Sequence, residues 1–299
     1  MTYWEIKEPE GSDYKHVHVS GKLDHPYRLP TAQCEKCGQS VCSLDVVLPN
    51  ECPARFRENR LLTNVESDVS IKEFNKLTKD LAVELQRSGT KIPKLLPGAC
   101  LQPGFLDVPS IPSADFLWSN LWSGLSFIVV SERVRASLEK LPTRDIAFYP
   151  VTFRQVDKRS AKSPPRISAS GEPEDVMKEI GVANKIYSIG PYYQLLVLAE
   201  SDYPPGAEPR SVCSACGEET DPDWEAKDTA WDNLTAEVLV SISKGYHIFK
   251  IPGRGAVYVT EAFKNLLEHL GATNVGFKLF RAPKVPVRRK RGNGVQRRK

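Results

Sequence analysis

Two copies of a CxxCG motif constrain this chain more than any other feature of its sequence. Two residues between the cysteines of a tight turn let both thiolates face one tetrahedral zinc ion, and a following glycine accepts the positive φ that such a turn often needs. A single CxxC also arises by chance or as a redox pair, whereas two copies, each followed by glycine, indicate metal binding. The copies are Cys34-Glu35-Lys36-Cys37-Gly38 and Cys213-Ser214-Ala215-Cys216-Gly217.

The two motifs leave two metal geometries open. In the first, the four cysteines of both motifs share one structural zinc, although the motifs stand in opposite halves of the chain. An ordinary zinc ribbon has only about 15 to 20 residues between its pairs. In the second geometry, each motif recruits other ligands. We favour the shared site, because no histidine or cysteine closely follows the second motif. The predicted zinc ligands are Cys34, Cys37, Cys213 and Cys216.

Candidate additional ligands lie only near the first motif. His16 and His18 alternate along a strand-like stretch and so share one face, while His25 and Cys42 are close in sequence. Each of them could complete a separate metal site. The simpler interpretation is a surface strand with polar histidines and a buried free cysteine. Two further cysteines are assigned no metal role: Cys52 and Cys100.

Cysteine usage and hydropathy indicate the compartment. Seven cysteines is an odd number, and four of them stand in CxxC pairs, which is typical of metal binding in a reducing compartment and not of a disulfide framework. No run of about 18 apolar residues occurs. Residues 1–13 lack the basic and apolar stretches of a secretory signal. We therefore expect a cytoplasmic protein without membrane contact.

The charge is distributed unevenly along the chain. The formal net charge is +4, but residues 284–299 contain eight Lys or Arg and no acidic residue. Subtracting these eight leaves residues 1–283 with a net charge of −4. We therefore expect an acidic folded body and a basic, disordered tail at 284–299.

Local patterns predict several helices and strands. Apolar residues recur at three- and four-residue steps from Ser70 to Ser88, which predicts a helix. The proline- and glycine-rich stretch 92–112 predicts an irregular loop. Trp118 and Trp122, four apart, predict an aromatic pair on a short helix. Further helices are expected from Ser131, as N-cap, and over 173–180, and strands over 126–130, 145–151, 192–198, 238–241, 246–251 and 256–259.

An internal repeat links the two halves. Adding 129 to each residue number places Ser131 on Thr260 and brings the following glutamates, leucines and strand residues into register. Both copies read as strand, capped helix, strand, and each follows a CxxCG. The predicted fold class is therefore α+β, with two related α+β modules joined around a four-cysteine, zinc-ribbon-like site. The expected divisions are an N-terminal module at 1–156 with an insertion at about 60–113, a linker at 157–172, and a C-terminal module at 173–283.

The sequence resembles the double-CxxCG motif proteins, a family grouped as immunity partners of contact-delivered bacterial toxins of the swarming-inhibition type. The likeness covers roughly residues 20–280 and departs from the family in the basic tail and the helix near Ser70. It implies a protein that binds and neutralises a cognate toxin inside the cell, with no catalytic residues. It is carried by Arg28-Leu29-Pro30, both CxxCG motifs, Leu96-Pro97-Gly98 with Pro103-Gly104, Asp115-Phe116-Leu117-Trp118 and the helix 131–141.

Other function classes fit less well. The chain has no HExxH, Ser126 lacks the flanking glycines of a nucleophile elbow, and neither CxxC has the upstream residues of a zinc deaminase. Redox CxxC pairs normally begin a helix, whereas polar turns follow both pairs here. The alternative is a zinc-ribbon protein that binds nucleic acid through its basic tail, although the acidic body argues against a broad duplex-binding face.

Overall fold

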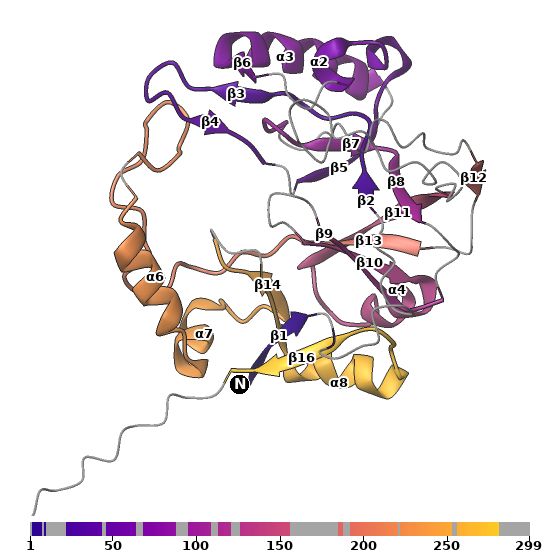
Figure 1. Ribbon diagram of the computed structural model, residues 1–299, viewed down its shortest axis with the longest axis vertical. Helices are drawn as coiled ribbons and strands as arrows, with labels where there is room; N and C mark the ends of the chain where they lie inside the picture. The colour runs from indigo at the N-terminus through magenta and orange to yellow at the C-terminus, as the bar shows by residue number, and fades with distance from the viewer. Residues whose placement is uncertain are drawn as a thin grey trace, which may run out of the picture.

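The protein is a mixed α+β structure, described by a computed structural model (Figure 1). The description covers residues 2–7, 9, 22–43, 46–63, 68–87, 95–108, 113–120, 126–155, 185–187, 192–220, 222–252 and 256–280. The helices are η1 (Ala54–Phe56), α2 (Arg60–Thr63), α3 (Ile71–Arg87), α4 (Glu132–Leu138), α6 (Trp224–Asp232), α7 (Ala236–Ile242) and α8 (Glu261–Leu270). The strands are β1 (Tyr3–Lys7), β2 (Lys22–Asp24), β3 (Thr31–Gln33), β4 (Ser40–Val41), β5 (Val47–Glu51), β6 (Asp68–Ser70), β7 (Cys100–Gln102), β8 (Gly104–Val108), β9 (Phe116–Asn120), β10 (Ser126–Ser131), β11 (Ile146–Gln155), β12 (Lys185–Tyr187), β13 (Tyr192–Val197), β14 (Ile248–Lys250), β15 (Val257–Thr260) and β16 (Gly276–Leu279).

Two larger sheets form the body of the molecule. The first sheet has the order β2-β8-β11-β13-β10-β9, with β12 paired to β11. The second sheet has the order β14-β15-β1-β16. Strand β1 begins the chain but lies between β15 and β16, antiparallel to both. The second sheet therefore combines a strand from the N-terminal end of the chain with three strands from residues 248–279.

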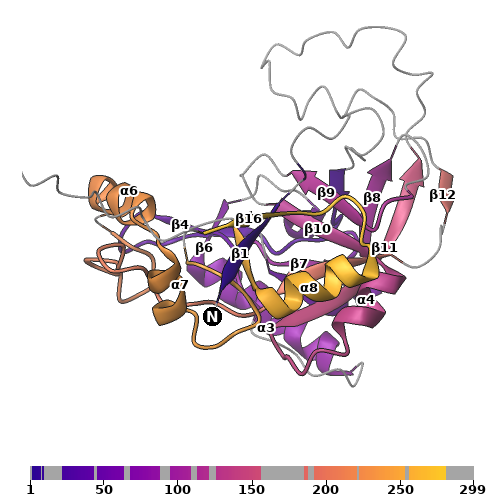
Figure 2. The ribbon, with the colours of Figure 1, turned by 90° about the horizontal axis from the view of Figure 1, so that it is seen from below.

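Helices α4 and α8 pack against one shared core between these sheets. The core is apolar and combines residues from both halves, such as Val130 and Val134 with Val259 and Phe263. Figure 2 shows the two helices side by side beneath the strands. The strands 126–130, 145–151, 192–198 and 256–259 are confirmed, as is a helix that follows Ser131. The Ser131 side chain, however, forms no cap hydrogen bond, because its hydroxyl donates to Asp115. Strands β13 and β15 are buried along nearly their whole length, and α4 and α8 each bury one face. Apolar runs and helical spacing therefore predicted these elements.

A separate core underlies the cysteine turn of the N-terminal half. Helix α3 buries Phe74, Leu77, Leu81 and Leu85 at the predicted spacing. These side chains pack on residues of β3, β5, β6 and β7. The helix begins with a capping box, in which the Ser70 hydroxyl accepts from the Glu73 backbone N–H while the Glu73 carboxylate accepts from Ser70. The predicted helix over 70–88 is confirmed over its described residues.

Two predictions in the N-terminal half were wrong. The expected short helix with Trp118 is strand β9, in which Phe116 and Leu117 are both buried, on opposite faces of the sheet. A strand buried on both faces has no polar alternation, so two tryptophans four apart imitated a helix. The expected irregular loop 92–112 contains β7 and β8. Strand β8 pairs in parallel with the distant β11, a partner that local sequence does not show.

The expected strand 238–241 was also wrong, because these residues lie in helix α7. Val238 and Val240 alternate with polar residues as in a strand, but Leu239 and Ile242 are the buried pair. The Thr235 side chain accepts from the Val238 backbone N–H and so caps the helix. The preceding threonine was the signal that the interpretation missed. The strand expected over 246–251 is present as β14.

Several expectations lie outside the described residues. They are the linker 157–172, the helix 173–180, Trp122, the histidines His16 and His18, and the tail 284–299. No helix in the described ranges is long and apolar enough to cross a membrane.

Candidate metal centre

The first CxxCG forms a tight turn between β3 and β4. The Cys34 backbone N–H donates to Gln39 O at 2.9 Å, and the Gly38 N–H donates back to Cys34 O at 2.8 Å. Gly38 has φ of 73°, as the motif predicted. The turn thus points both thiols of Cys34 and Cys37 to one side, although Cys34 is buried and Cys37 is half-buried.

The second CxxCG repeats this turn. The Cys213 N–H donates to Glu218 O at 2.8 Å, and the Gly217 N–H donates to Cys213 O at 2.7 Å. Gly217 has φ of 82°. Cys213 is buried and Cys216 is half-buried, which matches the first turn residue for residue. Each turn therefore presents one deep and one shallow thiol.

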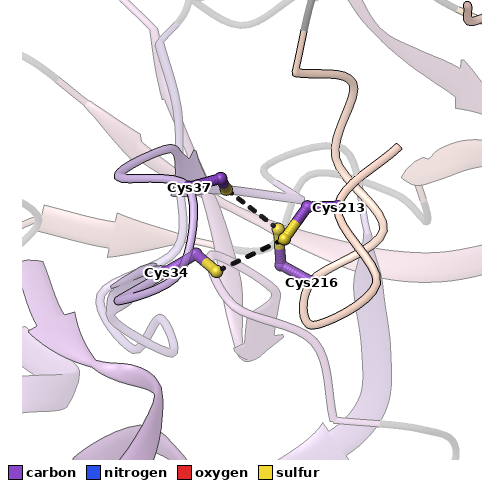
Figure 3. Close-up of side chains that lie close together, drawn as sticks. All are labelled: Cys34, Cys37, Cys213 and Cys216. Carbon is purple, nitrogen blue, oxygen red and sulfur yellow. Dashed lines mark hydrogen bonds between the residues drawn. The ribbon is translucent and has the colours of Figure 1, made fainter. Parts of the chain in front are cut away.

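The two turns bring their four sulfurs together (Figure 3). Cys34 Sγ lies 3.8 Å from Cys213 Sγ, and Cys37 Sγ lies 3.6 Å from Cys216 Sγ. All four sulfurs lie within 4.8 Å of one another. A tetrahedral zinc with Zn–S bonds of about 2.3 Å would have S···S edges of about 3.8 Å. The spacing therefore fits a four-thiolate metal site, and it is too long for disulfide bonds.

The four thiols do not ionise alike. Backbone hydrogen bonds from Ala215 and Cys216 lower the pKa of Cys213 to about 6. A backbone hydrogen bond from Cys37 likewise lowers the pKa of Cys34. At Cys216 the backbone hydrogen bond of Glu218 favours the thiolate, but burial and the neighbouring thiols outweigh it and raise the pKa to about 12. Four adjacent thiolates repel one another, so full ionisation calls for a cation among them.

Two lysines lie beside the first cysteine turn. A hollow next to Cys34 is lined by Glu35 and Lys36 from the turn and by Lys72 and Asn75 from the start of α3. Lys36 Nζ also donates to Ser214 Oγ at 2.5 Å and so ties one turn to the other. Four thiolates around a divalent ion carry a net charge of −2, which nearby lysines offset. These lysines were not among the predicted site residues, although Lys36 stands within the first motif.

The other candidate ligands lie outside this group. His25 is buried, with Nε2 3.2 Å from Gln194 Oε1 and Nδ1 3.2 Å from Leu101 O. Cys42 was expected to be a buried free cysteine, and this was wrong. It is exposed beside Gly98 and is not one of the four clustered thiols. Burial raises the pKa of Cys52 to about 11, so this thiol is not a ready metal ligand. Within the described residues, the group that could hold a metal is thus the predicted set of four cysteines.

Comparison with known proteins names no family. No protein-family model matches the chain, and no curated protein matches it significantly.

Proposed function

We propose that this chain is a binding protein whose two halves are fastened by one structural zinc. The main observation in its support is that four thiols from two distant turns lie at tetrahedral spacing. Four sulfur ligands complete the coordination of zinc and leave no open position for a substrate. The metal would therefore support the fold and take no part in catalysis.

The partner we propose is a cognate bacterial toxin, which the protein neutralises by binding. This part rests on the resemblance to the double-CxxCG immunity proteins. The charge pattern supports it: residues 200–237 contain eleven Asp or Glu and two Lys or Arg. Their net charge of −9 exceeds the −4 of residues 1–283 as a whole, so the remainder of the body is net positive. The acidic character is thus concentrated around the second cysteine turn and α6.

One side of α6 carries three of these carboxylates. Glu225, Asp228 and Asp232 follow each other at steps of three and four residues and are all exposed. The nearby cations Arg210 and Lys227 form ion pairs with Asp223 and Glu219, and so are engaged within the same segment. This α6 face would suit a toxin with a basic active surface, such as a nuclease cleft.

The test is co-purification with the product of the neighbouring gene, followed by protection of cells that express that toxin. We expect a complex, and we expect Asp228→Lys to weaken it at least tenfold. Asp80→Lys, on the exposed side of α3, is the matched control and should leave binding unchanged. Equal loss in both variants would reject the α6 face, and absence of any complex or protection would reject the immunity role.

A parallel measurement tests the nucleic-acid alternative. A chain lacking residues 284–299 is titrated with duplex DNA over a range of salt concentrations. Binding through the tail predicts that affinity disappears with it. Tight, undiminished binding by the truncated body would replace the immunity proposal with the zinc-ribbon one.

A further inference from the structure

The two large sheets share one arrangement of strands. In the second sheet, β1 lies between β15 and β16 and is antiparallel to both, and β14 pairs with β15. In the first sheet, β13 lies between β10 and β11 and is antiparallel to both, and β9 pairs with β10. The order β14-β15-β1-β16 thus repeats as β9-β10-β13-β11.

The repeat holds residue by residue. Tyr3 pairs with Thr260, and Tyr192 pairs with Ser131, which is the counterpart of Thr260 in the sequence repeat. Trp4 pairs with Leu279 on the other side, and Tyr193 pairs with Pro150, which is the counterpart of Leu279 under the same offset. The registers on both sides therefore align the same central strands, Tyr3-Trp4-Glu5-Ile6 with Tyr192-Tyr193-Gln194-Leu195.

Side-chain contacts repeat at the same positions. The Arg135 guanidinium lies 4.8 Å from the centre of the Tyr193 ring, and Lys264 Nζ lies 4.6 Å from the centre of the Trp4 ring. Each cation also pairs with the glutamate four residues on, at 2.6 Å in both cases. Positions 135 and 264 are related by the offset that relates Ser131 to Thr260.

The two cysteine turns also contact each other at equivalent positions. Like thiols face each other, the deep Cys34 with Cys213 and the shallow Cys37 with Cys216. This is the arrangement expected where two equivalent turns meet at a two-fold axis. The stretch from the second cysteine to the next shared strand, β9 or β14, is much longer in the N-terminal half, which agrees with an insertion there.

The central strands, however, are in the opposite halves. Strand β1 precedes the first cysteine turn in sequence but completes the second sheet, and β13 precedes the second turn but completes the first sheet. We propose that the chain is a tandem duplication whose two copies have exchanged their first strands, as in a domain-swapped dimer joined into one polypeptide. The exchange fastens the halves independently of any metal, because neither sheet is complete without a strand from the other half.

A pair of cross-linking variants tests the exchange in the full chain. Glu5 and Lys278 are register partners, and their side chains form an ion pair at 3.6 Å. We expect Glu5→Cys with Lys278→Cys to form a disulfide within one chain under mild oxidation, detected by peptide mass. The matched control is Glu5→Cys with Tyr149→Cys, which would be partners without the exchange, and it should not cross-link.

Cross-linking of the control pair in place of the first would overturn the proposal. A first pair that links two chains, and so runs as a dimer on a non-reducing gel, would place the exchange between molecules and overturn it equally. The unmodified protein gives a second measurement that does not depend on these variants. We expect cross-strand nuclear Overhauser contacts between Glu5 and Tyr258 and between Gln194 and Val129, and contacts between Glu5 and Val129 would contradict the exchange.

Discussion

The first and second sheets agree in strand order, register and a cation–ring contact, but they differ at the start of the helix that follows β10 or β15. In the second sheet, the Thr260 hydroxyl accepts from the Phe263 N–H and caps α8. In the first sheet, the Ser131 hydroxyl instead donates to Asp115 at 2.7 Å and does not cap α4. Strand order, register and the cation–ring contact are properties of the sheets themselves. The difference in capping lies where the two halves of the chain contact each other.

Asp115 connects the two halves. Its carboxylate accepts from Arg133 on α4 at 2.5 Å and from the Thr273 N–H at 2.9 Å. Arg133 in turn donates to Leu270 O and Gly271 O at the end of α8. The equivalent position in the second sheet is His247, which donates its backbone N–H to Asp145. The first sheet thus has a buried carboxylate at the contact between the halves, where the second sheet has a histidine.

The largest expected effect tests the equivalence of the cysteine turns. Cys34→Ser and Cys213→Ser each remove one deep ligand, so both should release the metal and lower the thermal midpoint by about 10 °C or more. Since the turns are equivalent, the two losses should be similar. Cys42→Ser is the control and should change neither metal content nor midpoint. A large loss in only one of the two variants would break the comparison.

The second prediction concerns the carboxylate that only the first copy has. Asp115→Asn removes the carboxylate that faces Arg133 and should lower the free energy of unfolding by about 2–4 kcal/mol. His247→Ala, at the equivalent position, keeps its backbone bond to Asp145 and loses the 3.3 Å contact of Nδ1 with the Thr260 hydroxyl. It should cost about 1 kcal/mol or less. Urea unfolding at neutral pH measures both. Equal losses would mean that the joint does not depend on Asp115.

Acid should distinguish the same two variants. Burial alone would raise the pKa of Asp115, but hydrogen bonds from Arg133, Ser131 and Thr273 hold it well below its usual range. A carboxyl with a lowered folded-state pKa stabilises the fold fully above its unfolded value, about 4, and loses this contribution as the pH falls through the folded value. The free energy of unfolding, measured in urea from pH 5 downward, should therefore fall less steeply in Asp115→Asn than in His247→Ala. Parallel curves would contradict this role.

The smallest effect concerns the caps. Thr260→Ala should cost about 1 kcal/mol through the lost N-cap, with or without Asp115→Asn. Ser131→Ala should cost a similar amount in the original protein but less in the Asp115→Asn background, because its hydroxyl there donates to a neutral amide oxygen in place of a carboxylate. A double-mutant cycle on unfolding free energies measures this coupling. Coupling of Asp115 to Thr260 would contradict the assignment.

Sequence patterns predicted the features that depend on local spacing. The cysteine turns and the helix near residue 70 both follow from residues close together in the chain. The exchange of β1 and β13 could not be predicted in this way. Both strands are ordinary apolar stretches in the sequence, and only their pairing partners reveal the exchange. Strands β7 and β8 were missed for the same reason, and α7 because Val238 and Val240 imitate a strand. The four ligands were predicted, but their meeting depends on a contact between turns that stand far apart in the chain.

The metal content of the purified protein tests the central claim most directly. Elemental analysis should give one zinc per chain, and X-ray absorption should give four sulfur neighbours at about 2.3 Å. The same preparation of Cys34→Ser should contain no stoichiometric zinc. Two zinc ions per chain, a nitrogen or oxygen neighbour in the first shell, or a metal-free protein with reactive thiols would contradict a single site shared by the two cysteine turns.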